Sequence, residues 1–216
     1  MFSAAVAETP FFLKMEAEPA PQIDDDREID FALMRRIGEG DHGAFRELVE
    51  KHQNAVIGTV AKMLGNASEA EDIAQQAFLR VWKNARRYRP DAKFTTYLFT
   101  ITRNLVFNET RRKSRKKEVS SDEREENSNK LVEANPDRQP DAEVLQAELQ
   151  GAVDAAIASL PESQRMAVVL RRYEQLSYEE IAEVLELSVS AVKSLLFRAR
   201  TNLREALAGY LEDGER

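Results

Sequence analysis

Apolar residues recur every three or four positions along most of this chain, and that spacing predicts amphipathic helices. In the first half the pattern predicts helices over residues 29–37, 45–64, 68–82 and 94–112. Gly38 to Asp41 ends the first helix and Gly65-Asn66 closes the second, while Ser68 with Glu71 has the spacing of a capping box for the third. No segment shows the sustained alternation or hairpin turns of β-strands.

Between residues 114 and 140 the apolar pattern stops, and Ser, Asn, Glu, Lys and two prolines dominate. Helical spacing returns from residue 141, and Pro161-Glu162 starts the next helix. The chain is therefore expected to be all-α. It would consist of a disordered N-terminal arm (1–27), a helical domain (28–113), a flexible acidic linker (114–140) and a second small helical domain (141–210).

Near the C-terminus, the sequence predicts two short helices joined by a tight turn. Ser177 with Glu180 forms a capping box for the first helix, residues 186–188 make the turn, and Ser188 caps the second helix. The second helix leaves a mainly basic set on or near its outer surface: Lys193, Ser194, Phe197, Arg198 and Arg200. Such a helix-turn-helix fits the major groove of DNA. The alternative is a helical hairpin with a solvated basic face.

Composition narrows the possible functions. The formal net charge is −7, which by itself argues against a nucleic-acid partner. Basic residues nevertheless gather at 111–117 and in the last helix, and such local patches, not the net charge, set the field that DNA meets. The chain has no cysteine, no metal-ligand spacing and no phosphate-binding glycine loop, so we expect no metal, no cofactor and no catalytic centre. No apolar run predicts membrane insertion and the N-terminus is a poor signal peptide, so the expected location is the cytoplasm.

Three blocks of sequence occur in an order that is specific. They are residues 71–82 (EDIAQQAFLRVW), residues 94–105 (FTTYLFTITRNL), and Leu160-Pro161 through the helix-turn-helix. Together they resemble the sigma factors of bacterial RNA polymerase, in particular the compact extracytoplasmic-function (ECF) group. The resemblance implies that 28–113 is similar to sigma region 2 and that 141–210 is similar to sigma region 4.

The resemblance also implies partners and contact residues. Core RNA polymerase would be bound through the clamp helices of its largest subunit and through its flap region, with the clamp contact at Asp72, Gln75, Gln76 and Phe78. Promoter DNA would be contacted at the −10 element by Arg103, Asn104, Arg111 and Arg112. At the −35 element the expected residues are Arg171, Lys193, Ser194, Phe197, Arg198 and Arg200. An anti-sigma factor is the expected regulator. Gln76 and Tyr97 depart from the Glu and Trp usual in the family.

Two other functional classes remain open from the residues alone. A stand-alone helix-turn-helix repressor or activator, acting as a dimer, would explain the third block but not the first two. A nucleic-acid enzyme would need Glu71 and Asp72 as metal ligands, but adjacent carboxylates on a helix point in different directions. The sequence therefore favours a promoter-specific initiation factor that is not an enzyme.

Overall fold

The computed structural model describes residues 25–119 and 142–208, and every regular element in these two ranges is helical, which confirms the all-α prediction. Residues 1–24, 120–141 and 209–216 lie outside the described residues, so most of the predicted N-terminal arm and linker is not described. In chain order the elements are α3 (Asp25–Gly38), α4 (His42–Leu64), α5 (Ala67–Asn84), η1 (Ala85–Arg87), α6 (Phe94–Val119), α7 (Ala142–Ser159), α8 (Glu162–Arg172), α9 (Tyr178–Leu185) and α10 (Val189–Ala206).

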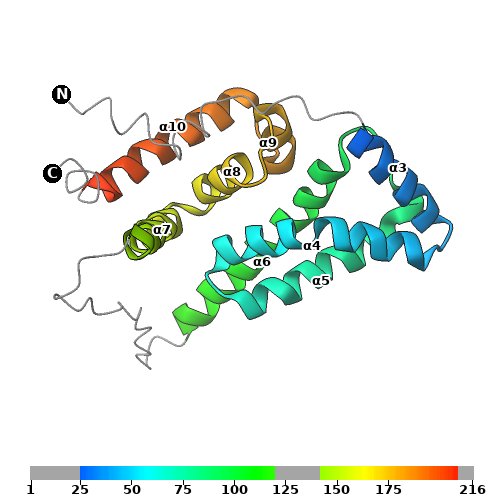
Figure 1. Cartoon of the computed structure of the whole chain (residues 1–216), viewed down its shortest axis with the longest axis horizontal. Coiled ribbons are helices and arrows are strands. Elements are labelled where there is room, and N and C mark those ends of the chain that lie inside the picture. Colours follow the sequence, from blue (N-terminus) through cyan, green and yellow to red (C-terminus); the bar gives the residue numbers. More distant parts are fainter. Residues whose placement is uncertain (1–24, 120–141, 209–216) are drawn as a thin grey trace.

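The N-terminal helical region is built around α4, which lies against both α5 and α6 (Figure 1). Its buried positions form one stripe at helical spacing: Ala44, Leu48, His52, Val56, Thr59, Val60 and Met63. From α5, Ile73, Ala77 and Val81 pack into the same core. Burial of these faces, rather than intrinsic helix propensity, stabilises helices of this length.

Short polar residues and glycine fix where these helices begin and end. The Asp41 carboxylate accepts hydrogen bonds from the backbone N–H groups of Gly43 and Ala44 at 2.8 and 3.0 Å. Gly65 ends α4 with φ of 70°, a left-handed conformation that glycine adopts without steric cost. The predicted Ser68–Glu71 capping box is wrong, because the Asn66 side chain accepts from Ser68 N and Glu69 N and starts α5 earlier.

Two helices are longer than the sequence pattern predicted. α3 already begins at Asp25, so its first turn includes residues 25–27 of the predicted arm. α6 continues to Val119, beyond the predicted end of the domain at residue 113. Residues 113–119 contain neither Gly nor Pro, which would weaken a helix. The basic side chains among them interact favourably with the negative C-terminal end of the helix dipole. Polar composition alone therefore misplaced both boundaries.

A buried ionic cluster ties α3 to α4. The Asp30 carboxylate lies 3.0 Å from His52 Nε2 and 2.9 Å from Lys51 Nζ, and Asp30 is 4% exposed. Burial alone would raise the pKa of Asp30, but its hydrogen bonds and ion pairs with His52 and Lys51 outweigh that effect and lower the pKa. His52 is therefore a structural partner of Asp30.

The C-terminal helical region packs α10 against both α8 and α9. Buried side chains from these three helices, including Met166, Leu170, Ile181 and Leu196, form its core. Figure 1 shows α7, α8, α9 and α10 as a group beside the N-terminal region. The helix-turn-helix is thus held by its own small core.

Replacing Ser177 with alanine is expected to lower the free energy of unfolding by about 1 kcal/mol, because it removes the α9 cap. Both halves of the predicted box are present: Glu180 N donates to Ser177 Oγ at 3.1 Å, and Ser177 N donates to the Glu180 carboxylate at 2.7 Å. Urea unfolding followed by circular dichroism measures the change, with the exposed Ser163→Ala as control. Equal stability of the two variants would contradict the cap assignment.

Candidate nucleic-acid and partner interface

The predicted helix-turn-helix is confirmed in its local geometry. Glu186 ends α9 in the left-handed conformation with φ of 57°, and Leu187 N donates to Ala182 O at 2.9 Å. Ser188 then caps α10, accepting from Ala191 N at 3.2 Å. These bonds satisfy backbone groups that helix ends otherwise leave without partners, so they stabilise the turn between the two helices.

One face of α10 is turned inward and the opposite face is exposed. Val192, Leu196, Ala199 and Leu203 are buried at helical spacing. The exposed set is Lys193, Ser194, Phe197 and Arg198. Phe197 is 68% exposed, the largest value among the exposed large apolar residues of the described chain. Arg200 lies at the edge of this face and is partly buried. A mixed basic, hydroxyl and aromatic face of this kind can contact phosphates, base edges and thymine methyl groups.

Arg171 does not lie on that face. Its side chain is only 2% exposed; Nη1 donates to Leu176 O at 2.9 Å, and the guanidinium carbon lies 4.6 Å from the centre of the Tyr178 ring. The guanidinium closes the α8–α9 loop from inside the C-terminal region. Its assignment to DNA, which rested only on its place before the helix-turn-helix, is therefore not supported by this arrangement.

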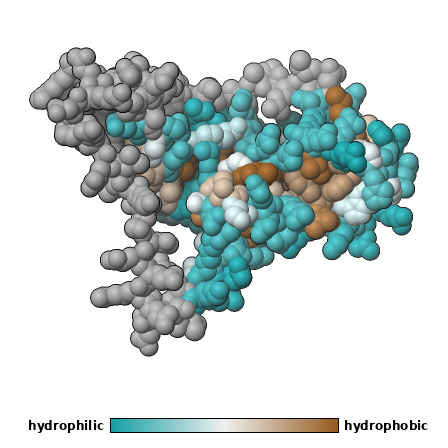
Figure 2. Space-filling view, turned by 60° about the horizontal axis from the view of Figure 1, so that its bottom comes forward, coloured by the Kyte–Doolittle hydropathy of each residue, from teal (hydrophilic) through white to brown (hydrophobic). Residues whose placement is uncertain are grey.

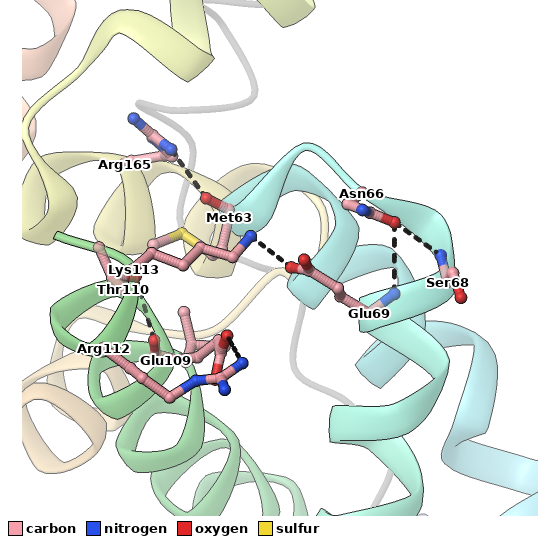
Figure 3. A network of polar contacts seen from close by, with 10 residues as sticks. Met63, Asn66, Ser68, Glu69, Glu109, Thr110, Arg112, Lys113 and Arg165 are labelled. Atoms are coloured by element: carbon pink, nitrogen blue, oxygen red, sulfur yellow. Dashed lines mark hydrogen bonds and ion pairs between the residues drawn. The ribbon is translucent and has the colours of Figure 1, made fainter. Parts of the chain in front are cut away.

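The C-terminal part of α6 carries a basic surface. Asn108, Arg111, Arg112, Arg115 and Lys116 line an open hollow there, and the end of α6 is hydrophilic (Figure 2). Arg112 is bound by Glu109, with Nε to Oε2 at 2.8 Å and Nη2 to Oε1 at 2.6 Å (Figure 3). Part of its charge is thereby balanced, whereas Arg111 is exposed. Lysine and arginine side chains on such a surface can neutralise phosphates of a nucleic-acid backbone and release their counterions.

Arg103 lies elsewhere on α6 and is 9% exposed. Its Nε donates to Val184 O at 2.9 Å and its Nη2 lies 2.5 Å from Glu186 Oε1, both in the helix-turn-helix of the other region. The neighbouring Asn104 is partly buried. In this arrangement Arg103 is covered by protein, so a contact with DNA would require the two regions to separate.

The exposed face of α5 differs in one residue from the sequence prediction. Asp72, Gln75 and Gln76 are exposed, but Phe78 is 4% exposed and packs in the core. Leu79, which is 47% exposed, is the apolar residue on the outer face, four positions after Gln75 and seven after Asp72. Helical periodicity could have identified Leu79, whereas Phe78 was assigned from the family resemblance.

The described residues hold no group of three or more His, Cys, Asp or Glu side chains that could bind a metal ion. Among the same residues, none of the helices combines the length and the apolar character that crossing a bilayer requires.

Comparison with known proteins matches one family model to each of the two helical regions. The family model described as Sigma-70 region 2 matches residues 48–116, and the model described as Sigma-70, region 4 matches residues 150–203. The RNA polymerase sigma-H factor of Pseudomonas aeruginosa is 33% identical over 87% of this chain and 98% of its own length. The ECF RNA polymerase sigma factor SigW of Bacillus subtilis is 32% identical over 81% of this chain and 94% of its own length.

Solved structures share the fold. CnrH, in complex with the cytosolic domain of CnrY, aligns with a TM-score of 0.61 at 24% identity, covering 84% of this chain and 98% of CnrH. The sigma factor RpoE from Bartonella quintana, solved with the anti-sigma factor NepR, aligns with a TM-score of 0.59 at 22% identity, covering 76% of this chain and 96% of RpoE. With both sigma-70 regions on its two helical regions and relatives above 30% identity over most of its length, the chain belongs to the ECF group of RNA polymerase sigma factors.

Proposed function

We propose that this chain is a promoter-specific initiation factor that binds core RNA polymerase, recognises the −35 and −10 elements and assists DNA melting. The observation that carries the proposal is the pairing of two surfaces on one sigma-type chain: an exposed polar face on α5 and an exposed DNA-type face on α10. The chain would perform no covalent chemistry itself, since the polymerase supplies the active site. It would act in the cytoplasm, where bacterial transcription takes place.

The polymerase contact proposed for α5 uses Asp72, Gln75 and Gln76, with Leu79 as the apolar anchor. Partner-binding faces commonly place a buried apolar anchor among polar side chains that exclude water. Leu79 is exposed on the same face, whereas Phe78 could reach a partner only by leaving the core. Leu79 therefore replaces Phe78 in the proposed interface with the clamp helices of the largest subunit.

For the −35 element, the proposed duplex contacts are Lys193, Ser194, Phe197 and Arg198, with Arg200 as a phosphate contact at the edge. Lys and Arg can donate to guanine O6 and N7, a serine hydroxyl can pair with several bases, and Phe can contact a thymine methyl. The C-terminal region is also proposed to meet the polymerase flap.

For the −10 element, Asn104 is the proposed base reader, because its amide can donate and accept at one adenine edge. Arg111 and Arg112 are proposed to hold phosphates, and Arg103 would join them once the helix-turn-helix leaves it. Melting costs base stacking, which contacts to a flipped base and to the single strand can offset.

A regulatory protein partner forms part of the proposal. RpoE from Bartonella quintana was solved with an anti-sigma factor, and CnrH with the cytosolic domain of CnrY. An anti-sigma factor that covers one of the proposed DNA or polymerase surfaces would hold this chain inactive. Its identity and the inducing signal are not encoded in a motif of this chain.

Binding to sigma-free core RNA polymerase tests the central claim. The double variant Asp72→Ala/Gln75→Ala is expected to bind roughly tenfold more weakly or worse, since interface hot spots are each worth over about 1 kcal/mol. Glu50→Ala/Asn54→Ala is the matched control, because it removes one carboxylate and one amide from an exposed face of α4. Leu79→Ala should weaken binding without loss of stability.

Failure of the folded, partner-free chain to bind core polymerase would contradict the initiation role. If that chain instead bound a palindromic DNA site as a dimer, the stand-alone regulator would be the better account. Equal binding by the double variant and its control would leave the initiation role intact and move the polymerase contact away from α5.

A further inference from the structure

The cations at the basic end of α6 differ in their surroundings. The open hollow on this surface is lined by Asn108, Arg111, Arg112, Arg115 and Lys116, and all five are exposed. Arg112 and the neighbouring Lys113 are each held in an ion pair with a carboxylate of the same helical region, and Figure 3 shows both pairs. These two carboxylates therefore influence how strongly the surface attracts phosphates.

The first pair is formed within α6. The Glu109 carboxylate accepts hydrogen bonds from Arg112 Nε at 2.8 Å and from Arg112 Nη2 at 2.6 Å. The side chain of Glu109 is 18% exposed and that of Arg112 is 69% exposed, so the carboxylate is the more covered of the two. Two-point pairs of this geometry are among the stronger charge-assisted hydrogen bonds. A phosphate that reaches Arg112 from solvent therefore meets a guanidinium that already has a counter-charge.

The second pair joins α6 to α5. The Lys113 ammonium pairs with the carboxylate of Glu69, 44 residues earlier in the chain (Figure 3). Glu69 lies in the first turn of α5, and its backbone N–H donates to Asn66 Oδ1. The positive end of the helix dipole favours a carboxylate at this position. The cap that starts α5 thus also places a negative charge opposite Lys113.

Glu109 lies in the field of several cations. The hydrogen bonds from Arg112, followed by the charges of Arg112, Lys113 and Lys116, hold the pKa of Glu109 below its ordinary value, although burial acts in the opposite direction. The carboxyl is therefore ionised at neutral pH. One negative charge thus stands among the cations that a nucleic-acid backbone would contact.

An internal counter-charge lowers the part of nucleic-acid binding that does not depend on sequence. A cation that neutralises a phosphate releases condensed counterions, whereas a cation with a carboxylate partner must first give up that pair or share it. A carboxylate about 7 Å from a phosphate also repels it in water by an energy equivalent to about threefold in affinity. Surface pairs of this kind contribute little to stability, so their larger effect falls on binding.

We propose that Glu109 and Glu69 limit the sequence-independent binding of α6 to DNA, because each holds one cation in an intramolecular pair and weakens its attachment to phosphates. The inference rests on the proposed −10 contact of Arg112. Competing sites in a genome number on the order of 10⁶ or more, so a lower sequence-independent affinity raises the share of the chain found at promoters. At a −10 element, the base contact proposed for Asn104 offsets the loss.

Binding of the full chain to a fluorescein-labelled DNA duplex of arbitrary sequence tests the proposal, with anisotropy measured from about 50 to 200 mM salt. Glu109→Gln removes the charge and nearly keeps the shape of the side chain. It should bind about threefold more tightly than the wild type at the low-salt end. Its slope of log K against log salt should be steeper by about 0.9, the value for one more neutralised phosphate, so the gain should disappear at about 200 mM.

Two further variants extend the test to the second pair. Glu69→Gln should give a similar gain through Lys113, and the two changes together should give about tenfold. Glu71→Gln is the matched control, because it removes the same charge from α5 at an exposed position two residues later, which turns the side chain to the other side of the helix. The control should bind the duplex as the wild type does.

Removing the partner cation tests the pairing itself. In an Arg112→Ala background, Glu109→Gln should cause no further change of slope, because no guanidinium is released to bind a phosphate. An undiminished gain in that background would overturn the proposal, as would equal affinities and slopes for Glu109→Gln and Glu71→Gln. Weaker binding by Glu109→Gln would mean that the carboxylate orients Arg112 towards phosphate, which overturns the proposal as well.

Polymerase binding separates this inference from the function on which it rests. If the wild type fails to bind sigma-free core polymerase, the initiation proposal fails, whereas the duplex measurement still decides the role of the two carboxylates. If the wild type binds polymerase while Glu109→Gln matches Glu71→Gln on the duplex, the initiation function stands and the inference is refuted.

Discussion

Replacing Arg171 with alanine is expected to lower the free energy of unfolding by about 3 kcal/mol and to disrupt the C-terminal region as a whole. The change would leave the buried Leu176 carbonyl without its donor, remove the cation over the Tyr178 ring and open space between α8 and α9. An unsatisfied buried carbonyl costs about 1–3 kcal/mol, and the lost packing and cation–π contact add to it.

Denaturant unfolding of Arg171→Ala and Arg198→Ala separates a structural arginine from a DNA-reading one. Arg198 is exposed on α10, so its loss should change the stability by less than about 0.5 kcal/mol while weakening binding to promoter DNA. For Arg171→Ala the main effect should instead be a lower free energy of unfolding. An Arg171→Ala protein of wild-type stability with weak DNA binding would restore the phosphate contact that the sequence suggested.

Local signals along the sequence were sufficient for most of the fold. Ser177 with Glu180, Ser188 and Gly65 each combine a residue type with a spacing that permits one geometry, and all three occur as predicted. The start of α5 was predicted wrongly because Asn66 and Ser68 are both favourable N-cap residues and lie two positions apart. Nothing local in the sequence decides between these two residues.

The candidate site was less predictable because it depends on which side of an element faces the core. Phe78 was assigned from the family resemblance and Arg171 from its place before the helix-turn-helix, yet both are buried. Arg103 and Glu186 are 83 residues apart, and no periodicity or motif connects two such positions. Long-range polar pairs of this kind follow from packing of the two regions, which sequence patterns do not encode.

Raising the pH from about 4.5 through 7 is expected to favour opening of the two helical regions. Burial where the α8–α9 loop meets α4 raises the pKa of Glu174 to about 7, although the hydrogen bond from Thr59 acts in the opposite direction. His52 and Glu180 line a cavity between the two regions together with Glu174, and the Lys62 ammonium on α4 lies over the Tyr173 ring. The pKa of Asp30, which binds His52, is lowered, so Asp30 titrates below this range.

The direction of this pH effect follows from the number of protons that each state binds. In the open state, with the two regions separated, Glu174 is expected to regain its ordinary pKa of 4.5. Between pH 4.5 and pH 7 the closed state, with the regions packed together, therefore binds more protons than the open state. Below pH 4.5 the group is protonated in both states and does not bias the equilibrium. Above pH 7 the closed state loses up to about 3 kcal/mol, since each unit of pKa difference is worth about 1.36 kcal/mol.

Fluorescence energy transfer between the two regions measures this shift, and the absence of native cysteine allows site-specific labels. Cysteines at the exposed positions Glu47 and Glu205 place one dye on each region. The wild type should show longer inter-dye distances at pH 8 than at pH 6. Glu174→Gln keeps the hydrogen bond with Thr59 but cannot ionise, so its distances should stay constant over that range. Other titrating groups would cause the opening if Glu174→Gln responded to pH as the wild type does, because only the Glu174 carboxyl differs between the two chains.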